Sequence, residues 1–209
     1  MPIISFVTQK GGSGKSTLAI NCAVAAEQAG RRVMLLDMDE QRTAEQWFQA
    51  RKAETPQIIT LQSAELQGAL ELARIKKFDW VLIDTPGRDT PGTSAAIRAA
   101  DLCVIPCRPS PADIQAIKPT VEAVRRANKA GAVVLMQTPA RSYRVEEAQD
   151  GLSKLMSVCP INIVSRAVYQ DALGAGYGVT EFDPHGKAAE EINQLWKWIS
   201  NQARKANNA

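Results

Sequence analysis

The residues best suited to chemistry lie near the start of the chain, where residues 10–17 read K-G-G-S-G-K-S-T. Glycines let backbone N–H groups turn inward and approach phosphate oxygens closely. A lysine in such a loop supplies a cation to the β- and γ-phosphates, and a serine hydroxyl is a ligand for Mg²⁺. We therefore expect a site for ATP and Mg²⁺ formed by Gly11, Gly12, Ser13, Gly14, Lys15, Ser16 and Thr17.

The elements around this loop agree with that interpretation. An apolar run at residues 3–7 precedes it, and a helical pattern at 18–29 follows it. A strand, a glycine-rich loop and a helix in this order place the positive end of the helix dipole at the phosphates. We expect Ser16 to ligate the metal directly and Thr17 to reach the α-phosphate.

Two further groups of carboxylates follow predicted strands. Asp84 ends the apolar run 79–84, where it would hold Mg²⁺ through water; capping a turn is its alternative role. Asp37 and Asp39 stand two residues apart at the end of the run 32–37. A structural alternative for Asp39 is a carboxylate that stabilises the N-terminus of the helix 42–52.

Apolar runs alternate with helical patterns along the whole chain. The predicted strands are 2–8, 32–37, 57–61, 79–84, 101–106, 131–137 and 160–164, and the predicted helices are 15–29, 42–52, 64–75, 92–99, 112–129, 144–156, 168–174 and 187–204. This alternation predicts an α/β fold with a doubly wound, mostly parallel sheet and helices on both faces. We expect a single domain, residues 1–209, with its ligand at the carboxyl ends of the strands.

Composition narrows the possible classes of protein. The net charge is +3, which permits contact with nucleic acid without demonstrating it. No apolar run approaches the roughly 20 residues that span a bilayer, so a cytoplasmic location is expected. The four cysteines form no C-x-x-C pair and are expected to be buried, and His185 is the only histidine, which excludes a His-rich metal site.

The loop departs from the common G-x-x-x-x-G-K-[ST] pattern, because position 9 is Gln9 and a second lysine, Lys10, opens it. The form K-G-G-x-G-K-[ST] resembles the deviant Walker A motif of ParA/MinD ATPases. Residues 37–41 are similar to the family's D-x-D-P-Q, residues 81–87 to its Walker B segment, and residues 104–113 and 186–192 to later family segments. The resemblance is nearest to small ParA-type, ParF-like partition ATPases.

This resemblance implies roles for particular residues. Lys10 would cross to the ATP of a partner subunit in a face-to-face dimer; a solvated lysine at a strand end is the alternative. Asp39 would position or deprotonate the attacking water, with Asp37 supporting Lys15 and the metal and with Gln41 sensing the γ-phosphate. Glu40 departs from the family's proline, and the proline-rich loop that starts at Pro106 would lie near the adenine and the dimer interface.

The resemblance also implies partners. ATP would drive homodimerisation and non-specific DNA binding, and a cargo-bound ParB- or ParG-like protein would stimulate hydrolysis near the nucleoid, without a membrane. The cargo would be a plasmid, a chromosome region or a protein assembly. The residues expected to contact DNA are Arg141, Arg144, Arg166, Lys197, Arg204 and Lys205. Scattered solvated charges are the alternative interpretation of this set.

Three other functions remain as alternatives. A MinD-like membrane switch would need an amphipathic C-terminal segment, whereas residues 201–209 are small and polar. An ATPase holding an iron–sulfur cluster would need cysteines in loops, whereas Cys103 lies in a predicted strand and Cys107 just beyond it. A metabolic ligase similar to dethiobiotin synthetase would have no evident use for Lys10.

Overall fold

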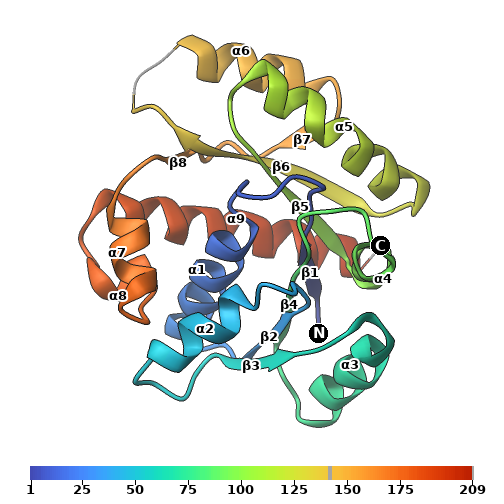
Figure 1. Ribbon diagram of the computed structural model, residues 1–209, viewed down its shortest axis with the longest axis vertical. Coiled ribbons are helices and arrows are strands. Elements are labelled where there is room, and N and C mark those ends of the chain that lie inside the picture. Colours follow the sequence, from blue (N-terminus) through green and yellow to red (C-terminus); the bar gives the residue numbers. More distant parts are fainter. Residues whose placement is uncertain (141–142, 209) are drawn as a thin grey trace.

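The computed structural model describes residues 1–140 and 143–208, in which a parallel sheet is flanked by helices (Figure 1). The strands follow the order β3-β2-β4-β1-β5-β6-β7, with β8 also paired to β6, and every paired register is parallel. Their bounds are β1 Ile3–Phe6, β2 Val33–Asp37, β3 Gln57–Thr60, β4 Trp80–Asp84, β5 Leu102–Cys107, β6 Ala130–Thr138, β7 Ser157–Val158 and β8 Ile163–Val164. The predicted fold class is confirmed.

Helices connect these strands. Their bounds are α1 Lys15–Gln28, α2 Thr43–Ala50, α3 Leu66–Ile75, α4 Pro91–Ala99, α5 Pro111–Arg126, α6 Tyr143–Ser153, α7 Val168–Gly174, α8 Val179–Phe182 and α9 Lys187–Asn207, and a 3₁₀ turn covers Ser63–Glu65. Within residues 1–140 and 143–208, no helix has the length and apolar character needed to cross a membrane.

The central strands are buried on both faces, which explains their continuous apolar sequences. Successive side chains of a strand point to opposite faces of the sheet, so they enter different cores. In β4, Leu82 packs in the core that includes α1 and α9, whereas Val81 and Ile83 pack in the core that includes α3. On that second face, the β5 and β6 side chains pack with α5 and α6.

The structure adds two short elements that the sequence did not predict. The strand β7 has two residues and the helix α8 has four, and segments this short carry no recognisable hydrophobic period. The predicted helix 144–156 ends at Ser153, where the serine hydroxyl donates to the Asp150 carbonyl, and the chain enters β7. On α9, Ile192, Leu195, Trp196 and Ile199 recur at three- and four-residue spacing and are all buried, so they form the face of the helix that packs in the core.

The sheet brings the polar strand ends together. In the register of the central strands, Asp84 at the end of β4 lies opposite Phe6 of β1 on one side and Asp37 of β2 on the other. The loops that follow β1, β2 and β4 therefore leave the same carboxyl edge of the sheet, which is where ligands bind in open α/β folds.

Candidate nucleotide-binding site

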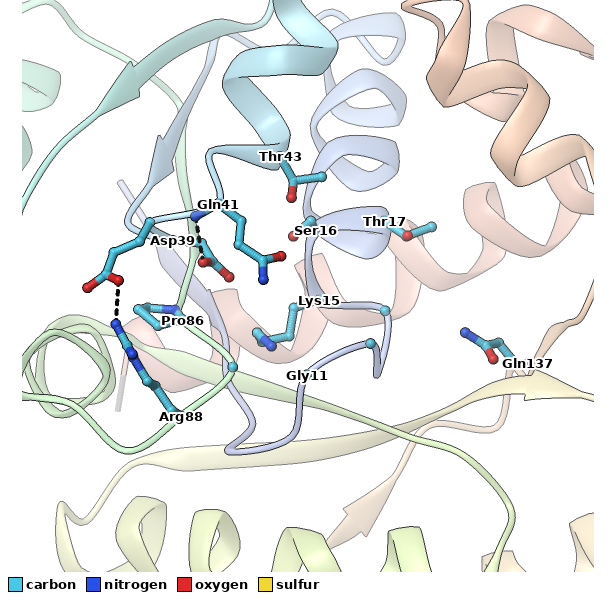
Figure 2. A pocket seen from close by; sticks show the side chains of 14 residues that line it. Gly11, Lys15, Ser16, Thr17, Asp39, Gln41, Thr43, Pro86, Arg88 and Gln137 are labelled. Atoms are coloured by element: carbon cyan, nitrogen blue, oxygen red, sulfur yellow. Dashed lines mark hydrogen bonds and ion pairs between the residues drawn. The ribbon is translucent and has the colours of Figure 1, made fainter.

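A cavity of about 480 Å³ opens at this carboxyl edge (Figure 2). Eight residues predicted from the sequence line it: Gly11, Gly12, Gly14, Lys15, Ser16, Thr17, Asp39 and Gln41. Six further lining residues are not among the predicted site residues: Glu40, Thr43, Pro86, Gly87, Arg88 and Gln137. Glu40, Pro86 and Gly87 lie inside the recognised segments 37–41 and 81–87, and Thr43 and Arg88 lie within two residues of them, whereas Gln137 lies apart from both.

The loop after β1 has the backbone shape that its glycines predict. Gly14 has a φ of 102°, a value that side-chain-bearing residues rarely adopt, and α1 begins at the next residue, Lys15. A Cβ at Gly14 would also lie 2.7 Å from the Met136 methyl group. Ser13 is buried and is not among the lining residues, and its Oγ has no hydrogen-bond partner within the described part of the chain.

Gly87, in the loop after β4, packs closely against the loop after β1. A Cβ at this position would lie 3.0 Å from the Gly11 Cα and 3.4 Å from the Lys15 Nζ. Any larger residue would therefore press on the backbone of the phosphate loop. This contact explains why a glycine follows Thr85 and Pro86, a point that the sequence pattern alone does not show.

Lys15 is buried among acidic side chains. Burial lowers the pKa of its ammonium group, while the charges of Asp84 and Asp39 oppose that shift. Its Nζ lies 3.5 Å from the Lys10 carbonyl oxygen. The side chain points into the cavity from the start of α1, as Figure 2 shows, so its charge faces the space that a phosphate would occupy.

Asp84 is fully buried, and neither of its carboxylate oxygens accepts a well-aligned hydrogen bond from the described residues, although the Ser16 hydroxyl lies close enough to act on it. Burial raises its pKa to about 7, against the opposing influence of the Ser16 hydroxyl and the Lys15 ammonium. Buried polar atoms without partners call for an explanation, because desolvation costs about 1–3 kcal/mol or more for each group. A hydroxyl and a carboxylate beside a phosphate loop fit Mg²⁺, which favours oxygen ligands and retains waters.

Asp37 has a different environment from the one predicted. Its carboxylate is buried and accepts hydrogen bonds from the backbone N–H groups of Asp39, Ala44 and Glu45, at 3.0–3.2 Å. It does not line the cavity. The helix-stabilising role considered for Asp39 thus belongs to Asp37, which satisfies the first free N–H groups of α2.

Asp39 lies inside the cavity and is held there by the local backbone. Its Oδ1 accepts a hydrogen bond of 3.0 Å from the Gln41 N–H, and both side chains line the cavity (Figure 2). Glu40, where the related motif has proline, pairs with Arg88 from the loop after β4. That ion pair joins the loops on which Asp39 and Gly87 lie. Both its side chains are more than half exposed, so it contributes little to stability.

Lys10 does not line the cavity, although it opens the same loop as Lys15. Its Nζ lies 2.6 Å from Oδ1 of Asp113 on α5, and Ser110 also hydrogen-bonds this carboxylate. Arg108 donates to the Gly12 carbonyl from the same side. Lys10 is therefore ion-paired rather than simply solvated, with 40% of its side chain exposed.

Pro106, which ends the predicted strand 101–106 and begins the expected proline-rich loop, lies inside β5, because the strand continues one residue further, through Cys107. The pairing of β5 with β1 ends at Val104, and beyond that residue β5 pairs only with β6. Proline has no N–H group, but at this position no hydrogen bond to β1 is needed. Pro106 is buried and does not line the cavity.

Gln137 does line the cavity. It has a left-handed backbone conformation, with a φ of 51°, and lies where the pairing of β6 with β8 is irregular.

The basic residues predicted to contact DNA are not in one place. Arg166 binds both carboxylate oxygens of Glu191, at 2.7 and 2.8 Å, so its charge is compensated. Arg144 lines a cleft between α5 and α6, whereas Lys197 and Arg204 line a groove beside α1. Lys205 is exposed near the end of α9, and Arg141 lies outside the described residues.

The predicted burial of the cysteines is confirmed. All four are free thiols with buried side chains: Cys22, Cys103, Cys107 and Cys159. Cys103 and Cys107 both belong to β5, and burial raises the pKa of each thiol to about 12. Iron–sulfur clusters are held by cysteine thiolates, so buried cysteines in a strand, with protonated thiols, are poorly suited to ligate one.

Comparisons with known proteins agree with this geometry. The chain is 32% identical over 198 residues to the maintenance of carboxysome distribution protein A of Halothiobacillus neapolitanus, covering 89% of this chain and 90% of that protein. It is 32% identical over 151 residues to protein ParA of Rhizobium radiobacter, covering 67% of each. The septum site-determining protein MinD of Pyrococcus horikoshii, solved with Mg-ADP, shares the fold with a TM-score of 0.77, 20% identity and 98% coverage of each chain.

The family assignment follows from the length of these matches together with the loop, the buried Asp84 and the strand order. Residues 4–173 match the family described as the CobQ/CobB/MinD/ParA nucleotide binding domain. Relatives that align over two thirds or more of their length include a carboxysome-distribution protein and a ParA protein. This chain therefore belongs to the ParA/MinD family of nucleotide-binding ATPases.

Proposed function

We propose that this protein is a ParA-type partition or positioning ATPase whose ATP-bound form is a homodimer. The observation that supports this most directly is the separation of the two lysines of the phosphate loop. Lys15 lines the cavity with Asp39 and lies close enough to Asp84 for the two charges to interact, whereas Lys10 lies outside the cavity and pairs with Asp113. A lysine that its own site does not use is available to a second subunit.

In this proposal the chain binds the phosphates through the loop N–H groups and the Lys15 ammonium. Ser16 and, through water, Asp84 would hold Mg²⁺, which would neutralise the charge that develops on the phosphates. The unpartnered oxygens of Asp84 support this assignment. Thr17, further along α1, would contact the α-phosphate.

The base would lie toward Gln137. In Figure 2 its side chain stands beyond Thr17, on the side of the cavity away from Asp39. An amide can both donate to and accept from a purine edge. Gln137 therefore replaces Pro106 as the residue that we assign to the base.

Asp39 would orient or deprotonate the water that attacks the γ-phosphate, at the opposite end of the cavity. Its hydrogen bond from the Gln41 N–H holds its carboxylate toward the cavity, and Gln41 would sense the γ-phosphate. Asp37 would act indirectly, by fixing the start of α2 and thus the loop that carries Asp39.

Lys10 would leave Asp113 and reach the nucleotide of the partner subunit when two ATP-bound chains meet. A cation supplied in trans stabilises transition-state charge and makes hydrolysis depend on dimerisation. The dimer would bind DNA without sequence preference near the nucleoid, and a partner protein on the cargo would stimulate hydrolysis and release.

Sedimentation of the protein with ATP, ADP or no nucleotide tests this proposal, together with binding to a random-sequence DNA duplex in each state. We expect a dimer and salt-sensitive DNA binding with ATP only, and neither for Lys15→Ala. A protein that stays monomeric with ATP, although it binds the nucleotide, would contradict the proposal.

A further inference from the structure

Arg88 is a cation in the nucleotide cavity to which the recognised motifs give no role. It lies in the loop after β4 and lines the cavity together with Lys15. Among the lining residues that the structure describes, these two side chains alone are basic. Figure 2 shows Arg88 at the Asp39 end of the cavity, on the side away from Gln137. The proposed function places the γ-phosphate at this end.

The backbone around Arg88 is held close to the phosphate site. The preceding residue is Gly87, where a Cβ would lie only 3.4 Å from the Lys15 Nζ. On the other side, the Arg88 carbonyl accepts a hydrogen bond of 2.9 Å from the hydroxyl of Thr93, in the first turn of α4. The side chain itself is 60% exposed. The arginine therefore has a fixed origin beside the phosphates and a long side chain that is free to turn.

Arg88 is paired with a carboxylate that lines the same cavity. Its guanidinium forms an ion pair with Glu40, which comes from the loop after β2 and is even more exposed than Arg88. An exposed pair of this kind is weak, because water solvates both charges and ordering two long side chains costs entropy. An anion that enters the cavity can therefore compete with Glu40 for the guanidinium.

A γ-phosphate at this end of the cavity needs a positive charge close to it. Asp39 and Glu40 both line the cavity, and their carboxylates repel an anion. A guanidinium presents parallel N–H groups that match phosphate oxygens, and a terminal phosphate carries more negative charge than a carboxylate. Exchange of Glu40 for the γ-phosphate would thus replace a weak ion pair with a stronger one.

We propose that Arg88 binds the γ-phosphate of ATP in its own subunit, and that Glu40 holds Arg88 aside when no γ-phosphate is present. This inference rests on the proposed function, because it takes this cavity as the ATP site. ADP has no phosphate at the Asp39 end, so Arg88 makes the chain favour ATP over ADP. Lys10 has a separate role, since it would reach the nucleotide of the partner subunit.

The test compares the affinity for ADP with that for AMPPNP, a non-hydrolysable ATP analogue that keeps a terminal phosphate. Calorimetric titration with Mg²⁺ measures both, at protein concentrations where sedimentation shows monomers. The variant Arg88→Met removes the charge and keeps a long side chain. A matched control, Arg42→Met, removes a nearby exposed arginine that pairs with Glu45 and does not line the nucleotide cavity.

We expect Arg88→Met to bind AMPPNP about ten-fold more weakly or worse, as loss of a charge-assisted hydrogen bond does, and to change ADP affinity by less than about two-fold. The control should keep both affinities, and thermal unfolding without nucleotide should show that each variant is folded. Equal losses for both nucleotides, or no loss for either, would overturn the assignment of Arg88 and leave the nucleotide site intact.

The variant Glu40→Gln tests the competing carboxylate. It should raise the affinity for AMPPNP by about two- to five-fold, which is the effect of removing a weak exposed ion pair. This gain should vanish when Arg88→Met is also present, because no guanidinium remains to be released. A gain that persists in the double variant would show that Glu40 acts only by repelling the phosphates, and would overturn its role in holding Arg88.

Failure of the proposed function gives a different result. An unaltered protein that binds neither AMPPNP nor ADP would refute the ATP site itself, and the role of Arg88 with it.

Discussion

The Nζ atom of Lys10 lies 2.6 Å from Oδ1 of Asp113, outside the cavity that Lys15 lines. Hydrogen bonds from Lys10 and Ser110 outweigh the effect of burial and lower the pKa of Asp113 below its usual range, so the carboxylate is ionised at neutral pH. With 40% of the Lys10 side chain exposed, the pair contributes at most about 1 kcal/mol to stability. The pair can therefore open at little cost.

Lys10→Ala should keep ATP binding and lose ATP-dependent dimerisation, because its own cavity does not use Lys10. Sedimentation with ATP measures the dimer, and fluorescence of a labelled nucleotide measures binding. Asp113→Asn is the matched control, since it removes the ion pair but leaves the lysine, and it should still form dimers. Normal dimers of Lys10→Ala would show that this lysine does not act in trans.

Asp39→Ala should lower kcat for ATP hydrolysis by about 10²–10⁴-fold, the usual contribution of a residue that positions or deprotonates a nucleophile. Its ATP affinity should change little, so the ATP-bound dimer should persist. A large loss of nucleotide affinity in Asp39→Ala would contradict its assigned role.

Asp37→Ala should instead lower the free energy of unfolding by about 1 kcal/mol or more, because N–H groups at the start of α2 lose their acceptor.

Asp84 should make stability depend on pH. Its pKa is raised to about 7 in the folded protein, so between about pH 4 and 7 the folded state binds the proton more tightly than the unfolded state does. Ionisation of Asp84 therefore lowers the stability of the nucleotide-free protein as the pH rises through this window. The Tm of the unaltered protein should fall relative to that of Asp84→Asn between about pH 5 and pH 8.

Addition of Mg²⁺ and ATP should reverse this trend, because a metal is held by the ionised carboxylate. Stabilisation by Mg²⁺ and ATP together should be larger at about pH 8 than at about pH 5, and Asp84→Asn should lose most of that difference. Identical pH profiles of the two proteins without nucleotide would show that Asp84 has an ordinary pKa.

Arg51 and Glu181 form a bidentate ion pair that ties the end of α2 to α8, at 2.7 and 2.8 Å. The Arg51 side chain is 3% exposed, and it also lies over the Trp47 ring. Arg51→Met would leave Glu181 without its partner, at a cost of about 3 kcal/mol in the free energy of unfolding. Chemical denaturation measures this loss.

Arg42→Met is the control for that measurement. It breaks an exposed ion pair with Glu45 on the same helix and should cost less than about 0.5 kcal/mol. The Arg51 pair should also weaken in acid, because Arg51 and the Gly178 N–H outweigh burial and hold the pKa of Glu181 below its usual value. Its stabilisation is present above the pKa of an unfolded glutamate and is lost as the pH falls through the lower folded value.

Much of the site was predictable because its parts are local in the sequence. The spacing of Gly14 and Lys15 after an apolar run indicated a phosphate loop at the start of a helix, and the structure has that order. The parallel sheet was also predictable, since strands buried on both faces need continuous apolar residues.

Other features depend on contacts between distant segments. Gln137 joins the cavity through a left-handed residue at an irregularity in β6, and no local pattern indicates such a residue. Pro106 was both the last residue of the predicted strand 101–106 and the first of the expected loop, and the loop begins one residue later than expected, after Cys107, because β5 continues past the end of its pairing with β1.

The glycine-rich loop, the acidic strand ends and the layered α/β fold were predictable from the sequence, because glycine spacing and apolar periodicity act over a few residues. Three further features came only from the folded structure: Asp37 stabilises α2 while Asp39 faces the cavity, Lys10 pairs with Asp113, and Arg31 and Lys197 line the same groove. Each of these depends on where separate elements pack against one another. Packing joins residues far apart in the chain, and spacing along a single sequence does not encode those distances directly.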